Sequence, residues 1–155
     1  MKIEMQSIGY VENPRKEIQD DYWGQVESKI ILDETIFKPD ATANLESFSH
    51  LEVIFYLDRI SDEKIELGSR HPRNNPSFPK VGIFGQRTKN RFNKIGVSRC
   101  KLLKVEGLTL TVRALDAISG TPILDIKPLL KSFLPEDEII EPDWTKNVMK
   151  DYYKD

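Results

Sequence analysis

Two polar loops in the middle of the chain carry the side chains best suited to bind an anion. Residues 80–100, KVGIFGQRTKNRFNKIGVSRC, contain six basic residues and three glycines, and the loop expected within them is residues 86–96. A second loop at residues 70–80, RHPRNNPSFPK, has a similar composition, and the two loops flank one strand. Arginine offers a planar fork of donors to carboxylates and phosphates, and glycine lets backbone N–H groups approach a ligand closely. The loops therefore predict a site for a polar, partly anionic ligand. The alternative is that they are solvated surface turns, which collect polar residues without a binding role.

Two aspartates accompany a turn later in the chain, in LDAISGTPILDIKP at residues 115–128. The turn pattern Ser119-Gly120-Thr121-Pro122 predicts that Asp116 and Asp125 lie just before and just after a loop, at strand ends. A carboxylate there can accept a hydrogen bond from a ribose, orient an amine or act as a base. In the alternative interpretation, one or both cap backbone N–H groups of the turn.

Other chemistries lack their sequence patterns. There is no Walker loop, no GxGxxG motif after a strand and no GxSxG elbow. His50 and His71 lie far apart and Cys100 is the single cysteine, so we expect no metal site and no intramolecular disulfide. With a formal net charge of -2, nucleic acid could be held only by a local basic patch. The lack of a signal peptide and of a transmembrane-length apolar run predicts a soluble cytoplasmic protein with no membrane partner.

Strands with one buried face are expected to position these loops. Apolar residues alternate with polar ones along residues 26–33, 51–58 and 108–113, and Glu106-Gly107 is a typical hairpin turn. Short strands joined by long loops favour a mainly all-β fold. We expect a small single-sheet antiparallel β-barrel with few short helices, because closure removes exposed strand edges.

The end of the chain follows a helical pattern. Trp144, Val148 and Tyr152 recur every four residues after Asp143, a candidate N-cap. This spacing predicts a short amphipathic C-terminal helix that docks on its own barrel or on a partner. We expect a barrel domain at residues 1–135 and a C-terminal tail at residues 136–155.

Four segments, taken in order, resemble the signatures of one family. They are SIGYVENP, LESFSHLEVIFYLDR, the stretch from HPRNNP to NKIGVSRCKL, and LDAISGTPILDIKPLL. These segments look like TsaA-like proteins, the family that includes the TrmO tRNA methyltransferases, and the resemblance spans about residues 8–135. The chain departs from the family at Phe92, where proline is usual, and at Ser119, where aspartate is usual.

The resemblance implies a single antiparallel β-barrel that forms a homodimer and uses S-adenosylmethionine to methylate N6 of threonylcarbamoyladenosine in tRNA. It also implies a set of cofactor contacts drawn from several loops. These are Trp23, Gly24, Gln25, Asp58, Arg59, Arg87, Val97, Arg113, Ala114, Leu115 and Asp116.

For such a reaction the protein mainly has to position the acceptor nitrogen and manage its proton, because the sulfonium is already a good methyl donor. Asp116 and Asp125 are the candidate proton acceptors, and Asn93 is a candidate orienting amide. The candidate RNA contacts are Arg73, Lys89, Arg91, Phe92 and Lys94; an aromatic side chain at Phe92 can stack on a base. The competing hypothesis is a non-catalytic module that binds S-adenosylmethionine or a partner.

Overall fold

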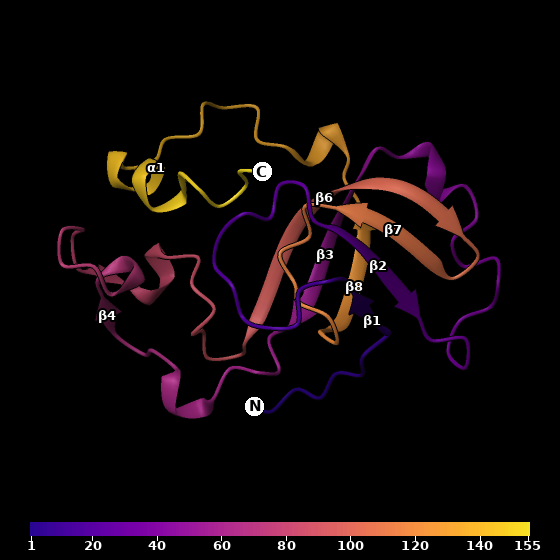
Figure 1. The fold of residues 1–155 in the computed structure, drawn as a ribbon, viewed down its shortest axis with the longest axis horizontal. Helices are drawn as coiled ribbons and strands as arrows, with labels where there is room; N and C mark the ends of the chain where they lie inside the picture. The colour runs from indigo at the N-terminus through magenta and orange to yellow at the C-terminus, as the bar shows by residue number, and fades with distance from the viewer.

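The strands of the chain form a closed antiparallel barrel (Figure 1). The computed structural model describes residues 1–155. Six strands follow one another around the barrel in the order β1-β2-β7-β6-β3-β8, and β8 pairs with β1 to close it. The strands are β1 (Gly9–Glu12), β2 (Glu27–Leu32), β3 (His50–Tyr56), β6 (Ile95–Glu106), β7 (Thr109–Arg113) and β8 (Pro122–Pro128). The predicted mainly β fold and the barrel are confirmed.

The barrel interior is filled by one cluster of apolar side chains. Leu51 and Val53 of β3, Ile30 of β2, and Leu110 and Val112 of β7 are fully buried. Because side chains alternate between the two faces of a strand, this burial fixes the register, in which Ile30 lies opposite Leu110. The packed interior makes the barrel a firm frame for the long loops at its edge.

The loop predicted at residues 86–96 is preceded by a strand, as expected, but it ends two residues early because β6 has already begun. Val81–Gly82 form β5, which pairs with β4 (Ser69–Arg70), and β6 begins at Ile95. Two inward side chains of β6, Ser98 and Cys100, are buried, although Ser98 is polar. Gly96 is required in this strand because a Cβ atom there would lie 2.2 Å from Cε2 of Phe55 on the neighbouring strand β3.

Between β3 and β6 the chain leaves the barrel for residues 57–94, which we call the excursion. It contains the β4–β5 pair and short 3-10 helices at Asp62–Lys64, Pro72–Asn74 and Ile83–Gly85. In Figure 1 the excursion, with its label β4, lies on the same side of the barrel as the C-terminal helix α1 (Asp143–Met149). These two segments therefore meet the barrel on one side of the molecule.

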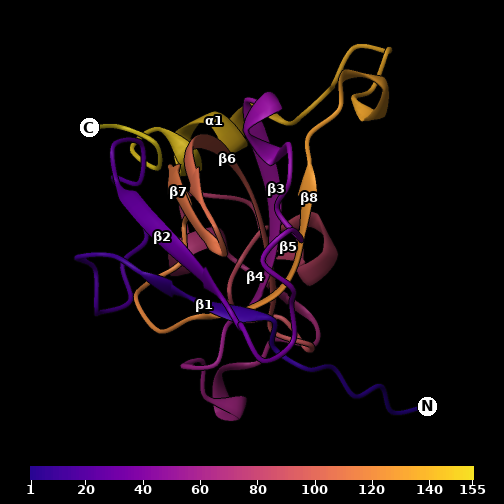
Figure 2. The ribbon, with the colours of Figure 1, turned by 90° about the vertical axis from the view of Figure 1, so that its right-hand side faces the viewer.

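After β8 the chain turns through a 3-10 helix at Lys131–Phe133 and runs back across the top of the barrel to α1 (Figure 2). The predicted C-terminal helix is present, but two details of the prediction are wrong. Pro142 occupies the N-cap position, so Asp143 is the first helical residue and caps nothing with its side chain. The helix ends at Met149, and Tyr152 lies in the turn that follows. No helix of the structure has the length and apolar character needed to span a membrane.

Candidate functional site

A cavity of about 1100 Å³ lies where the barrel, the excursion and the C-terminal segment meet. Its barrel wall includes Phe55, Gly96 and Val97, and its excursion wall includes Arg87 and Arg91. Trp23 of the loop before β2, Asp116 of the loop before β8, and Trp144, Val148 and Tyr152 of the C-terminal segment complete the enclosure. A cavity of this size, with mixed apolar and polar walls, can hold a cofactor-sized ligand.

Four arginines of the cavity wall have no carboxylate within ion-pairing distance, although carboxylates also line the cavity. Arg59, Arg70, Arg87 and Arg91 all line it, and none forms an ion pair with a carboxylate. Their hydrogen bonds go to backbone oxygens instead: Arg87 Nη2 donates to Val97 O at 3.1 Å and Arg91 Nη1 to Gln86 O at 2.8 Å. The Nε of Arg70 is buried and has no partner. Free guanidinium groups of this kind favour an anionic ligand such as a carboxylate or a phosphate.

Three other basic residues predicted to contact RNA are already neutralised by carboxylates. Arg73 pairs with Asp21, Lys89 with Asp20 and Lys94 with Asp62. The hydrogen bonds from Arg73 lower the pKa of Asp21, and the hydrogen bond to Asp62 raises the pKa of Lys94. The basic surface is therefore weaker than the sequence alone suggests, because three of its charges are paired.

Asp116 has one satisfied and one unsatisfied carboxylate oxygen. The hydroxyl of Tyr152 donates to Oδ2 at 2.5 Å, whereas Oδ1 is buried with no hydrogen-bond partner. Burial, together with the charge of Asp116, raises the pKa of Tyr152 well above its ordinary value, so its hydroxyl remains a donor. The same two causes raise the pKa of Cys100 to about 12. An orphaned carboxylate oxygen beside a cavity is suited to accept a hydrogen bond from a ligand hydroxyl or amine.

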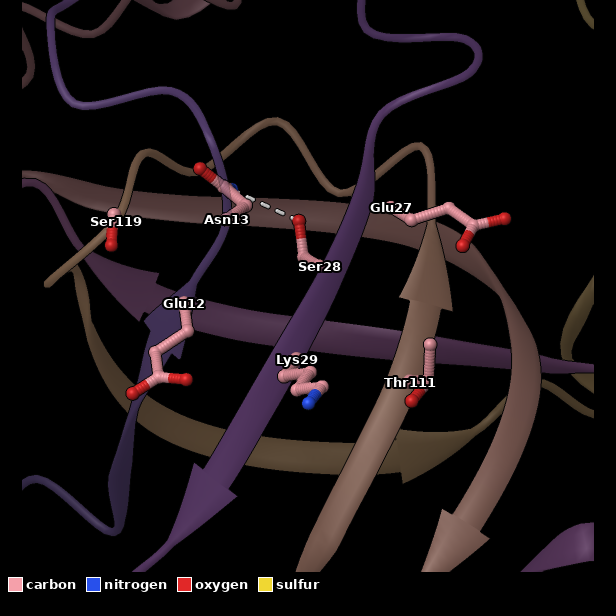
Figure 3. A pocket seen from close by; sticks show the side chains of 7 residues that line it. All are labelled: Glu12, Asn13, Glu27, Ser28, Lys29, Thr111 and Ser119. Carbon is pink, nitrogen blue, oxygen red and sulfur yellow. Dashed lines mark hydrogen bonds between the residues drawn. The ribbon is translucent and has the colours of Figure 1, made fainter.

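A second, shallower hollow lies on the outside of β1, β2 and β7 (Figure 3). A hydrogen bond at this hollow holds the loop that carries Asp116. Within the hollow Asn13 points toward Ser28, and its Nδ2 donates to Ser28 Oγ at 2.9 Å and to Ala117 O at 2.8 Å. The bond to Ala117 ties the residue after Asp116 to the start of the chain. Because the amide of Asn13 is satisfied within the protein, we assign this hollow a structural role and not a ligand.

The C-terminal segment lies directly against the loop that was predicted to touch the cofactor. Tyr22 N donates to Asp151 O at 3.0 Å and Trp23 N donates to Tyr152 O at 2.8 Å. A Cβ atom on Gly24 would lie only 2.0 Å from Tyr153 O, so glycine is needed for this close approach. The end of the C-terminal segment therefore docks on the chain's own loop before β2, and Trp144 and Val148 of the predicted stripe line the cavity.

The cavity collects most of the predicted site residues. Those that line it are Trp23, Asp58, Arg59, Arg73, Arg87, Lys89, Arg91, Phe92, Asn93, Val97 and Asp116. The other predicted contacts, which are absent from its lining, are Gly24, Gln25, Lys94, Arg113, Ala114, Leu115 and Asp125. Leu115 is fully buried in the barrel core, and Arg113 bonds Glu27 across the β2–β7 pair at 2.8 Å.

Asp125 departs most from the sequence expectation. It does not follow a loop at a strand end but sits within β8, because the strand begins at Pro122. Its carboxylate bonds its own neighbours, Ile126 N at 2.9 Å and the ammonium of Lys127. The two candidate proton acceptors therefore occupy different places, and only Asp116 lies in the cavity wall.

Three features of the site have little or no signal in the sequence. Arg70 was included in a basic loop but not singled out, and its position at the end of β4 turns it into the cavity. No sequence pattern marks Asp20 and Asp21, because each pairs with a basic residue more than 50 positions away in the chain. Tyr152 appeared only as part of an apolar stripe, and its bond to Asp116 depends on how the C-terminal segment folds back.

The chain is a closed antiparallel β-barrel, and its cavity is suited to a polar ligand because arginines, aromatic side chains and an orphaned carboxylate oxygen line it. The sequence profile of the tRNA-methyltransferase O N-terminal domain matches residues 9–133. The chain belongs to this TrmO/TsaA-like family, as the motifs indicated.

Individual relatives support the same assignment. The chain is 36% identical over 98 residues to a human protein named tRNA (adenine(37)-N6)-methyltransferase, which covers 63% of this chain and 22% of the human one. It is 30% identical over 128 residues to an S-adenosyl-L-methionine-binding protein of Archaeoglobus fulgidus, covering 79% of this chain and 86% of that one. The fold is shared with the crystal structure of TrmO from Pseudomonas aeruginosa, which superposes with a TM-score of 0.72 at 23% identity, over 93% of this chain and 62% of that chain. The chain thus spans about a fifth of the human relative and most of the archaeal one.

Proposed function

We propose that the protein is an S-adenosylmethionine-dependent methyltransferase that acts on N6 of a modified adenosine, threonylcarbamoyladenosine, in tRNA. Two relatives are named for this kind of activity or for binding this cofactor. The observation that carries the proposal is the cavity itself, in which unpaired arginines lie beside an aspartate that has a free, buried oxygen. S-adenosylmethionine has a carboxylate, an ammonium, ribose hydroxyls and an adenine ring, so such a wall matches its groups.

The residues of the cavity fit this cofactor. We assign Arg87 to the methionine carboxylate, because its guanidinium has no carboxylate of its own and offers a bidentate fork. Asp116 Oδ1 accepts a hydrogen bond from a cofactor hydroxyl or amine. Val97 supplies exposed apolar surface for the ring, the buried Trp23 lies in the wall behind the site, and Asp58 and Arg59 border the same space. When bound, the cofactor supplies an electrophilic methyl group.

The protein must also orient the acceptor amine and accept the proton that the amine loses. Asn93, which lines the cavity, is assigned to orient the acceptor amine through its side-chain amide. Of the two candidate proton acceptors we favour Asp116, because Asp125 lies within β8 and already bonds Lys127. A carboxylate oxygen has two lone pairs, so in this assignment Asp116 Oδ1 accepts the hydrogen bond of the cofactor with one and the proton lost by the acceptor nitrogen with the other.

We assign the binding of tRNA to side chains of the excursion. Arg91 has a free guanidinium charge, and the ring of Phe92 is 75% exposed, which suits it to stack on an unpaired base. Arg73, Lys89 and Lys94 would join once phosphates compete with their carboxylate partners.

We also propose that two chains form a homodimer and that residues 1–135 and 136–155 act as barrel domain and tail. Leu67 and Phe84 of the excursion are 75% and 91% exposed, and burying such apolar side chains against a second copy would stabilise the pair. A tRNA substrate would place the protein in the cytoplasm.

The proposal is tested by calorimetric titration of the protein with S-adenosylmethionine, followed by transfer of a labelled methyl group to tRNA. We expect micromolar binding that Arg87→Ala weakens at least 10-fold, and transfer that requires tRNA carrying threonylcarbamoyladenosine. Alanines at Lys89, Arg91 and Lys94 should instead weaken tRNA binding in a salt-dependent way. Arg99→Ala is the matched control, because Arg99 bonds Glu52 across the β3–β6 pair and lies outside the cavity.

Each outcome has a distinct meaning. Binding without transfer to any tRNA would identify a non-catalytic S-adenosylmethionine-binding module, the competing hypothesis. No binding with or without tRNA would contradict the cofactor assignment. Equal affinity in the wild type and in Arg87→Ala would show that the carboxylate is held elsewhere.

A further inference from the structure

The C-terminal segment, residues 143–155, is built into the edge of the cavity. Its backbone pairs with the loop before β2 through Tyr22 N to Asp151 O and Trp23 N to Tyr152 O. Gln25 Nε2 adds a bond of 2.8 Å to Asp155 Oδ1. Gly24 has no side chain where Tyr153 O approaches. These contacts fix the segment in one position next to Asp116.

In that position the segment forms a wall and does not fill the site. Trp144, Val148, Met149, Tyr152 and Tyr153 line the cavity together with the barrel residues. The space of about 1100 Å³ remains with the segment in place, and small-molecule sites commonly measure about 300–1,000 Å³. A ligand can therefore bind while the segment stays docked.

The C-terminal segment contacts the proposed cofactor-binding residue Asp116 through the hydrogen bond from Tyr152. We infer that Tyr152 is a positioning residue of the cofactor site, whose hydroxyl holds Asp116 Oδ2 so that Oδ1 is left free to accept a hydrogen bond from the ligand. The inference rests on the proposed function, since it takes the ligand of Asp116 to be S-adenosylmethionine.

The physical reason is the freedom of an aspartate side chain. A carboxylate without a fixed neighbour can rotate and present either oxygen, and ordering it on binding lowers affinity. A charge-assisted bond at 2.5 Å from a half-buried tyrosine removes that freedom before the ligand arrives. The backbone bond from Trp23 N to Tyr152 O holds the tyrosine itself in place.

The test is a calorimetric titration of the full-length chain with S-adenosylmethionine, comparing the wild type with Tyr152→Phe. Removing this hydroxyl should weaken cofactor binding about 10-fold or more, since hydrogen bonds to charged groups are among the stronger ones. Tyr10→Phe, at an exposed tyrosine of β1 outside the cavity, is the matched control and should bind like the wild type. Thermal unfolding of both variants checks that the barrel is intact.

A double-mutant cycle separates positioning from a general structural effect. In an Asp116→Ala background the change Tyr152→Phe should have no further effect on cofactor affinity, because the tyrosine acts through the carboxylate. In turnover, Tyr152→Phe should raise the KM for S-adenosylmethionine and leave the KM for tRNA unchanged. A loosened fold would raise both.

The outcomes distinguish this inference from the proposed function. No cofactor binding by the wild type overturns the proposed function and this inference with it. Wild-type binding that Tyr152→Phe leaves unchanged overturns the inference alone. Tighter binding by Tyr152→Phe also overturns it, because the hydroxyl would then compete with the ligand for Asp116.

Discussion

Arg73 of the excursion and Asp21 of the loop before β2 form a bidentate ion pair, with distances of 2.7 Å from Nη1 to Oδ2 and 2.5 Å from Nη2 to Oδ1. The bonds from Arg73 lower the pKa of Asp21, so the pair is ionised at neutral pH. Both side chains are partly exposed, at 32% and 21%, and such a pair adds little to stability. Its main consequence is that Arg73 is not free to bind phosphate.

Asp21→Asn should release this arginine. We expect the affinity for tRNA to rise several-fold at low salt. The slope of log affinity against log salt concentration should become steeper by the amount that corresponds to about one additional phosphate contact. Fluorescence anisotropy titrations across a series of salt concentrations measure both quantities. Glu34→Gln removes the same charge at an exposed site outside the cavity. Equal gains from the two variants would indicate a change in overall charge and not the release of Arg73.

Gly24→Ala should detach the C-terminal segment from the barrel. The added Cβ would lie 2.0 Å from Tyr153 O, which forces the two backbones apart. Hydrogen exchange at Trp23 N, the donor to Tyr152 O, should then become much faster, while exchange in the barrel core stays slow. Gly68→Ala is the control, since its nearest atom is at 3.5 Å. Unchanged protection at Trp23 in the Gly24 variant would contradict the docking described above.

Gly96→Ala should destabilise the barrel where β3 meets β6. The new methyl group would lie 2.2 to 2.8 Å from ring atoms of Phe55, and overpacking of this kind costs about 1–3 kcal/mol. Urea unfolding followed by circular dichroism gives the free energy of unfolding. At Gly82 an added Cβ meets nothing within 4 Å, so Gly82→Ala should leave that free energy nearly unchanged. A similar loss in both variants would rule out the ring contact as the cause.

The thiol of Cys100 should react slowly with labelling reagents in the folded protein. Burial, followed by the charge of Asp116, raises its pKa from 9.0 to about 12, so roughly 1000-fold less thiolate is present at pH 8. Labelling with a disulfide reagent at pH 8 should be slow in buffer and fast in denaturant. Because the pKa is higher in the folded state, its contribution to stability is complete below about pH 9 and is lost as the pH rises toward about 12. Rapid native labelling would mean that the barrel opens readily.

The strands were predictable where burial imposes a clear two-residue period. Leu51 and Val53 of β3 and Leu110 and Val112 of β7 alternate with outward polar or less buried residues, and those strands lie where expected. The first half of β6 was missed because one of its inward residues, Ser98, is polar, which weakens the alternation. Its pairing with β3 comes from tertiary context, which a local pattern does not contain.

The candidate site was predictable to the extent that it depends on residue type. Arg87 and Asp116, which the family resemblance indicated, line the cavity together with Arg91 of the basic loop. Asp125 was misplaced because the strand extends through it, and the turn pattern alone does not reveal where a strand begins. Tyr152 and the ion pairs of the basic residues depend on segments that are distant in the chain, so no local spacing could indicate them.

The excursion also bears on how freely this barrel can be modified. β3 and β6 pair through seven successive residues, although residues 57–94 separate them in the chain. The entropy cost of closing a flexible loop rises only with the logarithm of its length, so doubling the length adds about 0.6 kcal/mol. Insertions in the exposed turn around Asn75 and Ser77 should therefore leave the barrel folded. Such insertions would reshape the surroundings of the cavity, which makes the excursion the natural place to redesign what this barrel accepts.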